Sequence, residues 1–411
     1  MEATQRTAER PANAITVPAF RNLWSCNVAF FLVMNAQRFA FGWVVLDLLL
    51  LDEGAQGLIV FSLGAPVALL VLHAGAWADR WDRRRMLIST QLAGALVMAA
   101  TAILIGSGHV TIAWLIALTL LAGSAVAIGQ PVRSSLVPVL VAREQLFSAI
   151  ALNAIAMTLS LILGPVLIKL VGDQFGFDGA FWFQAVLLLV GVFFLWRLEV
   201  PPHAEVRERR SVRTETGEAL RHILGDPHLK TLFGLLLLAS LTIHPAVMVT
   251  MQAHVKEEFG RDSGDAAFPF AAMGVGMALS SFFLMRHGDM KNKGAVFQRA
   301  MLCGSTITFL TALVPSFWQV VALAGLMGLA GGFFINMNQG LVQANTPQPL
   351  MGRTMGVYTL VANGLFPAGA LALGVAATFI GTRWTIATAA VIGFAVVATT
   401  YVRDSELRRL S

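Results

Sequence analysis

The sequence predicts an all-α membrane protein with twelve transmembrane helices, arranged as two pseudo-symmetric bundles of six. Three observations support this fold: an apolar composition, a series of apolar stretches of membrane-spanning length, and matching residues in the two halves of the chain. Hydrophobic residues make up 56% of the 411 residues, and only 13% are charged. A single water-soluble core would not bury this much apolar surface, so lipid is the expected solvent.

Each apolar stretch ends at charged residues, glycine or proline, which places its helix. The first half predicts helices at 22–45, 56–78, 86–105, 111–132, 147–170 and 179–198. The second half predicts helices at 230–253, 266–285, 295–315, 317–340, 353–380 and 384–402. We therefore expect an N-terminal bundle at 1–198 and a C-terminal bundle at 230–411. The polar, basic segment 199–229 is the expected cytoplasmic linker between them.

Residues that recur 210 positions apart indicate that the two halves are repeats. The recurring pairs are Arg143 and Arg353, Asn153 and Asn363, Gly164 and Gly374, Leu140 and Leu350, and Asp79 and Asp289. Transporters built from such repeats place the substrate site where the repeats meet.

The basic residues predict the orientation. With the N-terminus in the cytoplasm, 24 of the 29 Lys and Arg residues fall on cytoplasmic segments, as the positive-inside rule requires. Four fall on the opposite side, at Lys169, Lys256, Arg261 and Arg383. The first 20 residues lack the apolar core of a signal peptide, so we expect both termini in the cytoplasm and the first helix as the insertion signal. The same bias explains the pI of 9.9 without a nucleic-acid partner.

The charged stretch GAWADRWDRRRM, residues 75–86, separates the second and third predicted helices. Its residues Gly75, Asp79, Arg80, Arg83 and Arg84 resemble the signature of the major facilitator superfamily between those helices. The longer stretches "WADRWDRRRMLISTQ" and "LVQANTPQPLMGRTMGVYTLVANG" are similar to the efflux branch that includes the bacterial enterobactin exporter. The resemblance implies transport by alternating access. It also implies that Asp79 and its neighbours form a conformational latch with the helix that starts near Arg353.

Two departures from the pattern of efflux members keep other transport modes open. Gly164 and Pro165 are followed by Leu167, Ile168 and Lys169 instead of a pair of small residues. The stretch "IALTLLAGSAVAIGQ" of the fourth helix also lacks the arginine of many proton-coupled members. Uptake or facilitated transport of a small anionic or lipid-like solute is therefore the alternative to efflux.

Arg38 is the sharpest candidate for substrate binding, because it lies inside the first predicted helix. Placing a guanidinium at the centre of a membrane helix costs at least about 2.5 kcal/mol, so it needs a water-filled cavity or a partner. One interpretation is that Arg38 attracts an anionic substrate group. The other is that it extends to the lipid headgroups or pairs with Asp47.

Further polar residues at membrane depth either line a cavity or bridge helices. The substrate-binding candidates among them are Asn35, Gln37, Asn153, His244, Gln252, Asn336, Asn338, Gln339 and Asn363. The candidates for proton coupling are His244, Asp47 and His73, because the predicted membrane interior holds no Asp or Glu. A buried His244 would equally fit a neutral hydrogen-bonded role.

Motifs for other chemistry are missing from the sequence. No Gly-Lys pair occurs, which excludes a Walker A loop, and no HExxH, CxxC or nucleophile elbow is present. We therefore expect no enzyme activity, no cofactor and no metal site.

The favoured function is secondary active transport, specifically proton-driven efflux of amphipathic or hydrophobic small molecules such as drugs or siderophores. The expected location is the bacterial inner membrane, where the protein would act as a monomer. A non-transporting membrane receptor or scaffold is the alternative of another class.

Overall fold

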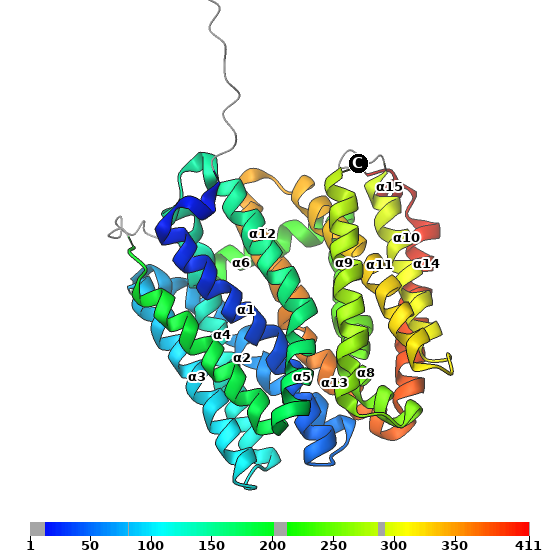
Figure 1. Ribbon diagram of the computed structural model, residues 1–411. Coiled ribbons are helices and arrows are strands. Elements are labelled where there is room, and N and C mark those ends of the chain that lie inside the picture. The colour runs from blue at the N-terminus through cyan, green and yellow to red at the C-terminus, as the bar shows by residue number, and fades with distance from the viewer. Residues whose placement is uncertain (1–12, 81, 201–211, 287–291, 411) are drawn as a thin grey trace, which may run out of the picture.

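The computed structural model describes residues 13–80, 82–200, 212–286 and 292–410. Side chains are described in these ranges except at 71–80, 147, 212–216 and 409. In the described ranges the regular structure is helical, without strands. Figure 1 shows two groups of long helices side by side, the first from the blue-to-green part of the chain and the second from the yellow-to-red part.

The described residues of the first half form five long α-helices, and the last of these crosses the membrane twice. They are α1 (Pro18–Trp43) with its π-helical extension η2 (Val44–Leu48), α2 (Glu53–Arg80), α3 (Arg83–Gly106), α4 (Ile112–Leu140) and α5 (Leu146–Trp196). Within α5, Gly176 has φ 78° and ψ 175°, which breaks the helix. Glycine adopts this positive φ without steric cost. The two parts of α5 therefore correspond to the expected fifth and sixth crossings.

The second half contains six crossings. They are α7 (Pro227–Leu238) with η4 (Ala239–Ile243) and α8 (His244–Phe259), then α9 (Ala267–Arg286), α10 (Lys293–Thr311), α11 (Phe317–Ala344), α12 (Met351–Thr359) with η7 (Leu360–Gly364) and α13 (Phe366–Ile380), and α14 (Thr382–Arg403). Ten stretches of the described chain have the length and hydropathy of a membrane span. Counting α5 twice and adding the 19-residue α10 gives the twelve crossings, so the predicted fold class is confirmed.

The two ends of the bundle differ. The first turns of α1 and the short α15 (Ser405–Arg409) lie at the same end, which we call the terminal face (Figure 1). We call the opposite end the gate face. The expected linker contains a helix, α6 (Val212–Gly225), which contacts α12.

The apolar core is distributed unequally along the bundle. On the gate side, one cluster joins both halves and contains Phe39 and Trp43 together with Met251 and Phe270. Towards the terminal face, each half has a separate core: one around Phe20, Met86 and Leu136, the other around Leu232, Phe297 and Leu341. The halves are thus packed together at the gate face and have independent cores at the terminal face.

A seam of small residues joins the halves where α2 packs against α13. A Cβ added to Gly57 would lie 2.8 Å from the Ala370 carbonyl oxygen, and one added to Gly64 would lie 2.1 Å from Pro367 Cγ. Glycine is required at both positions because the helices approach too closely for a larger residue.

Two π-helical segments, η4 and η7, interrupt crossings of the second half. Each is followed within three residues by a proline, Pro245 and Pro367. Proline supplies no N–H for the helical ladder, and the widened turn accommodates the missing hydrogen bond. These segments end beside His244 and Phe366, so they set the positions of both side chains.

Candidate functional site

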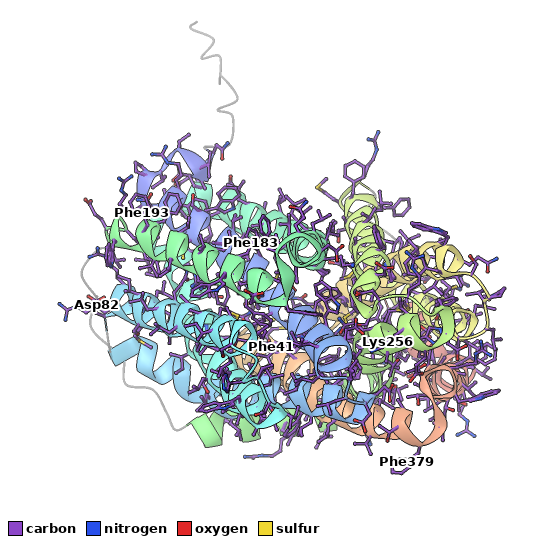
Figure 2. The ribbon with its side chains drawn as sticks, turned by 60° about the horizontal axis from the view of Figure 1, so that its bottom comes forward. Phe41, Asp82, Phe183, Phe193, Lys256 and Phe379 are labelled. Carbon is purple, nitrogen blue, oxygen red and sulfur yellow. The ribbon has the colours of Figure 1, made fainter. Side chains whose placement is uncertain are left out.

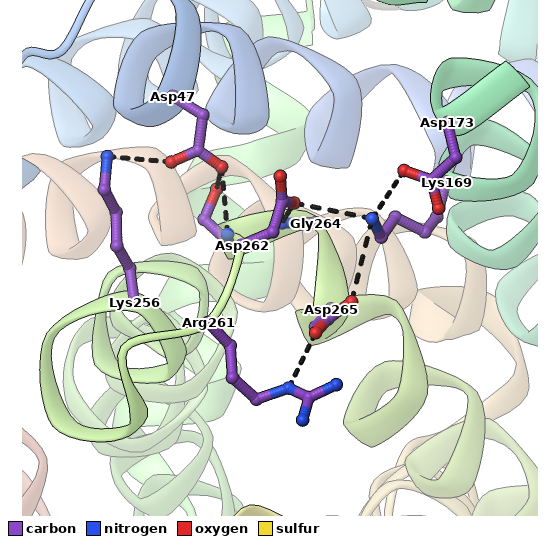
Figure 3. Close-up of polar contacts among 9 residues, drawn as sticks. Asp47, Lys169, Asp173, Lys256, Arg261, Asp262, Gly264 and Asp265 are labelled. Atoms are coloured by element: carbon purple, nitrogen blue, oxygen red, sulfur yellow. Dashed lines mark hydrogen bonds and ion pairs between the residues drawn. The ribbon is translucent and has the colours of Figure 1, made fainter.

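An ion pair across the two halves lies at the gate face. Lys256 Nζ, from the end of α8, is 2.8 Å from Asp47 Oδ1, from η2. Asp47 Oδ2 also accepts hydrogen bonds from the backbone N–H of Ser263 at 2.9 Å and from its hydroxyl at 2.7 Å (Figure 3). Lys256 additionally donates to the Leu46 carbonyl oxygen. Figure 2, which brings this end forward, shows Lys256 at the junction of the two groups of helices.

A second group of charges extends this closure around Lys169 of α5. Its Nζ is 2.6 Å from Asp173 in the same half, and 3.6 Å and 3.7 Å from Asp262 and Asp265 of the other half (Figure 3). Arg261 pairs with Asp265 at 2.6 Å. Burial raises the pKa of the Asp262 carboxyl, a group in the loop between two crossings.

The four basic residues that the sequence assigns to the non-cytoplasmic side therefore share one region. Lys169, Lys256 and Arg261 pair as described above, and Arg383 Nη2 lies 2.6 Å from Glu258 Oε2.

Beneath these ions, a layer of buried amides and aromatic rings seals the interface. Gln252 Nε2 donates to the Phe39 carbonyl oxygen at 3.1 Å, and Gln56 Nε2 donates to Gln252 Oε1 at 2.7 Å. Phe39 meets Phe270 of the other half edge-on, with ring centroids 6.1 Å apart. Gln56 and Gln252 are at most 2% exposed. Gln252, a substrate-binding candidate, thus lies in the interface seal.

On the terminal side of this layer lies the cluster formed by Arg38, His244 and Phe366. Arg38 is the only exposed residue from Asn22 to Asp47, a stretch that the structure describes completely. Its Cζ is 5.0 Å from the centroid of the Phe366 ring, and that ring is 4.7 Å from the ring of His244, which is also exposed. Arg38 comes from the first half and the other two residues from the second. The structure thus brings together two residues that sequence reasoning singled out separately.

The Arg38 guanidinium has no carboxylate partner among the described residues. Asp47, the partner that the sequence suggested, pairs with Lys256 instead. A cation over an aromatic face gains some stabilisation, but its N–H groups stay available for an oxygen acceptor. The Arg38 site can therefore bind an anion.

Three of the seven other amide candidates bridge helices. Asn153 Oδ1 accepts from Asn27 at 2.9 Å, Asn338 donates to the Leu232 carbonyl oxygen at 3.2 Å, and Asn336 donates to Ser281 Oγ at 3.3 Å. Asn35 donates to the Phe31 carbonyl oxygen of its own helix. Gln37 is buried, Gln339 is half-buried and Asn363 is exposed.

The latch candidates fall in three groups. Gly75, Asp79 and Arg80, and likewise the proton-coupling candidate His73, belong to α2 at positions outside the described side chains, and Asp289 lies outside the described residues. Arg84 donates to the Leu195 carbonyl oxygen at 3.0 Å and to that of Trp196, which caps the end of α5 in the same half. Arg83 begins α3. Arg353 pairs with Glu218 of α6, so this residue ties the linker helix to α12.

Arg133 is a functional candidate that the sequence reasoning missed. We expected the fourth helix to end at 132 and Arg133 to lie in a cytoplasmic loop. Instead α4 continues through Pro131 and Pro138 to Leu140, and Arg133 is 3% exposed. Prolines are tolerated in membrane helices because neighbouring groups satisfy the freed carbonyls. The expected end of the helix was therefore wrong.

Arg133 is held by neutral partners. Its Nη1 donates to Asn27 Oδ1 and to Cys26 Sγ, both at 3.0 Å, its Nη2 donates to Gln91 Oε1, and its Cζ is 4.0 Å from the Phe30 ring centroid. Its Nε has no hydrogen-bond partner among the described groups. Together with Gln37, Gln91 and Phe30, it lines a small cavity inside the first half.

Comparison with known proteins gives consistent results. A model of the major facilitator transmembrane secretion effectors matches residues 11–409. The multidrug efflux pump Tap of Mycolicibacterium fortuitum is 24% identical over 348 residues, covering 82% of this chain and 83% of its own. The enterobactin exporter EntS of Salmonella typhi is 24% identical over 351 residues, covering 83% of this chain and 81% of its own.

Solved structures show the same fold. The nucleoside transporter NupG superposes with a TM-score of 0.73 at 15% identity and covers 93% of this chain and 98% of its own. A bacterial homologue of the lysosomal transporter Spinster superposes with a TM-score of 0.70 at 14% identity, covering 95% of this chain and 98% of its own.

Proposed function

Since the chain belongs to the transmembrane secretion effectors of the major facilitator superfamily, we propose that this multi-pass membrane transporter exports amphipathic, anionic small molecules. Relatives named as a multidrug efflux pump and an enterobactin exporter support efflux as the direction. The substrate would be drug-like or siderophore-like and would carry at least one carboxylate, phenolate or similar anionic group.

The observation that carries this proposal is the exposed, carboxylate-free Arg38 below a sealed gate face. Phe366 supplies an apolar surface beside it, and His244 supplies a neutral or protonated imidazole. A ligand with an anionic group next to an aromatic or aliphatic body matches this combination. We place the terminal face, and with it both termini, in the cytoplasm, because most basic residues lie on that side. The described conformation is then closed to the outside, and substrate enters from the cytoplasm.

The transport cycle that we propose uses the difference between the gate face, where the two halves are packed together, and the terminal face, where each half has its own core. Substrate binding at Arg38 would favour separation of the charges at the gate face and closure at the terminal face. Release to the outside would then let the gate face close again. We propose that protons drive this cycle in the inner membrane, with His244 and Asp47 as the described candidates for carrying them, and that the protein works as a monomer.

Flux measurements in proteoliposomes test the proposal. A panel of anionic amphiphiles is first screened by thermal shift on the purified protein. Each hit is then followed in vesicles with an imposed pH gradient and in vesicles where an ionophore has collapsed it. We expect accumulation against the substrate gradient only with the pH gradient. Flux that ignores the gradient would instead favour facilitated transport, and binding without flux would favour a receptor or scaffold.

A further inference from the structure

Arg133 is a charged side chain buried inside the first half without a counter-charge. It is 3% exposed, and its hydrogen-bond partners Asn27, Cys26 and Gln91 are neutral groups. These partners belong to α1 and α3, and neither of those helices nor α4 itself contains an Asp or Glu. A buried ion that nothing neutralises is destabilising. The site therefore favours a negative charge that the surrounding helices do not supply.

The amide partners fix the orientation of the Arg133 guanidinium. Gln91 Nε2 donates to the Leu188 carbonyl oxygen at 3.1 Å, and Asn27 Nδ2 donates to Asn153 Oδ1 at 2.9 Å. Each amide therefore turns its oxygen towards Arg133. The partners use N–H groups of Nη1 and Nη2, whereas the Nε–H has no partner among the described groups. A further acceptor would find this donor already in place.

A small cavity adjoins the guanidinium. Its volume is about 20 Å³, and Arg133 lines it together with residues that include Phe30, Gln37, Thr90, Gln91 and Gly94. Roughly 10–15 Å³ is enough space for one water molecule, so the cavity holds one water or one monatomic ion but no organic substrate.

This cavity is separate from the Arg38 cluster. All of its lining residues belong to the first half, whereas the Arg38 cluster joins both halves. Along α1, Phe30 precedes Arg38 by about two helical turns.

We propose that the cavity binds a single monatomic anion, chloride in the cell, as the counter-ion of Arg133. The ion accepts a hydrogen bond from the Arg133 Nε–H and neutralises the buried guanidinium. Because the guanidinium is already held in place, the ion binds without reorganising the side chains around it. An oxyanion such as sulfate is too large for a cavity of about 20 Å³.

The bound ion is a resident component and not a transported one. Its cavity lies within one half, so movement of the two halves against each other does not open it. The ion therefore travels with the first half and stabilises that half in both conformations. This inference goes beyond the proposed function, and it holds whether or not the transported molecule is anionic.

Thermal unfolding of the purified protein in nanodiscs tests the inference. Sodium chloride replaces sodium gluconate at constant ionic strength, so that only the anion changes. We expect the unfolding temperature to rise and saturate, by about 5 °C between chloride-free buffer and about a hundredfold excess over Kd. Bromide should act like chloride, whereas sulfate should act like gluconate. An unfolding temperature that ignores chloride would mean that only water occupies the cavity and would overturn the inference.

Crystals grown in sodium bromide locate the ion directly. Bromide scatters X-rays anomalously, so we expect an anomalous peak inside the cavity, within hydrogen-bonding distance of Arg133. An empty cavity with a peak at Arg38 instead would contradict the site.

Two variants remove the site in different ways. Arg133→Gln removes the charge and should abolish the dependence of the unfolding temperature on chloride. Gly94→Ala keeps the guanidinium and fills the cavity, because Gly94 lines it and an added Cβ would meet only Leu188 Cδ1, at 3.3 Å. This variant should also abolish the dependence. If Arg133→Gln does not fold, Gly94→Ala makes the same comparison.

Two control variants keep the cavity intact. Arg143→Gln changes an exposed arginine outside the cavity, and Arg38→Gln changes the other anion site. Both should keep the full response of the parent protein to chloride. A response that survives in Gly94→Ala, or that Arg38→Gln abolishes, would place the ion elsewhere and overturn the inference. Flux measurements on anionic substrates are read independently, so failure of either proposal leaves the other standing.

Discussion

Lys256 Nζ lies 2.8 Å from Asp47 Oδ1, and this pair connects the last turn of α8 in one half to η2 in the other. The pair lies at the end of the bundle where the two halves share one apolar core. Because the lysine side chain is 37% exposed, solvent weakens the attraction. The pair therefore acts as a reversible contact of the closed gate face.

Asp47→Asn should shift the protein towards an open gate face. Losing the carboxylate removes the charge that Lys256 pairs with, at a cost of about 1 kcal/mol, or roughly a fivefold change in the closed-to-open ratio. The distance between spin labels at His109→Cys, between α3 and α4, and Leu313→Cys, after α10, measures the change. Asp173→Asn is the matched control, because Asp173 contacts Lys169 of its own half. An equal shift in both variants would contradict a specific role for Asp47.

Arg38→Gln should weaken the binding of anionic ligands by about 10-fold to 100-fold, the range expected for a lost charge-assisted hydrogen bond. Neutral ligands should bind unchanged, because Phe366 remains in place. Isothermal titration of one anionic hit and its neutral ester checks this difference. Arg21→Gln, an exposed residue at the start of the same helix, serves as the control. Undiminished affinity for all anionic ligands would show that Arg38 is not part of the binding site.

Gly57→Ala should destabilise the contact between the halves. The added Cβ would lie 2.8 Å from the Ala370 carbonyl oxygen, a backbone atom that cannot move aside easily. Overpacking of this kind costs about 1–3 kcal/mol. Gly340→Ala in α11 is the control, since a Cβ there meets nothing within 4 Å, and alanine favours the helix by up to about 1 kcal/mol. Thermal unfolding should therefore move in opposite directions for the two variants.

Arg133→Lys should destabilise the first half nearly as much as Arg133→Gln. The guanidinium binds Asn27, Cys26 and Gln91 at once, and a single ammonium group does not reproduce that geometry. Unpaired buried acceptors cost about 1–3 kcal/mol. Thermal unfolding measures the loss, with Arg143→Gln at an exposed loop as the control. Full rescue by lysine would mean that charge alone matters at this position.

Hydropathy was sufficient to predict the twelve crossings. A long apolar stretch in lipid forms a helix because only a helix satisfies all of its backbone hydrogen bonds within the segment. Hydropathy did not predict that the fourth helix continues past Arg133, because two prolines and an arginine have the composition of a loop. In the structure, side chains of neighbouring helices accept hydrogen bonds from Arg133. The sequence showed Gly164 and Gly374 as a repeated pair, but it did not predict which helices they contact. Gly164 approaches Ala36 of α1, whereas Gly374 approaches Gly57 of α2.

The candidate site was predictable only in part. Arg38 and His244 stand out individually as polar residues in apolar helices, but their common position depends on how the two halves meet. The burial of Glu53 was not predictable, because "LDEG" has the composition of a surface loop. Its burial arises from contact with the second half, including an approach of its carbonyl oxygen to Gly374. A contact between segments so far apart in the chain leaves no local pattern.

The break at Gly176 has a mechanical consequence. The part of α5 before it packs against α9 of the other half, with Ile162 close to Gly274. The part after it carries exposed apolar residues such as Trp182, Leu189 and Phe193, as expected for a surface that faces acyl chains. Because one residue joins the two parts, tilting of the outer segment in a thinner or thicker bilayer is transmitted directly to the moving interface. Membrane thickness should therefore tune the rate at which this protein alternates between its states.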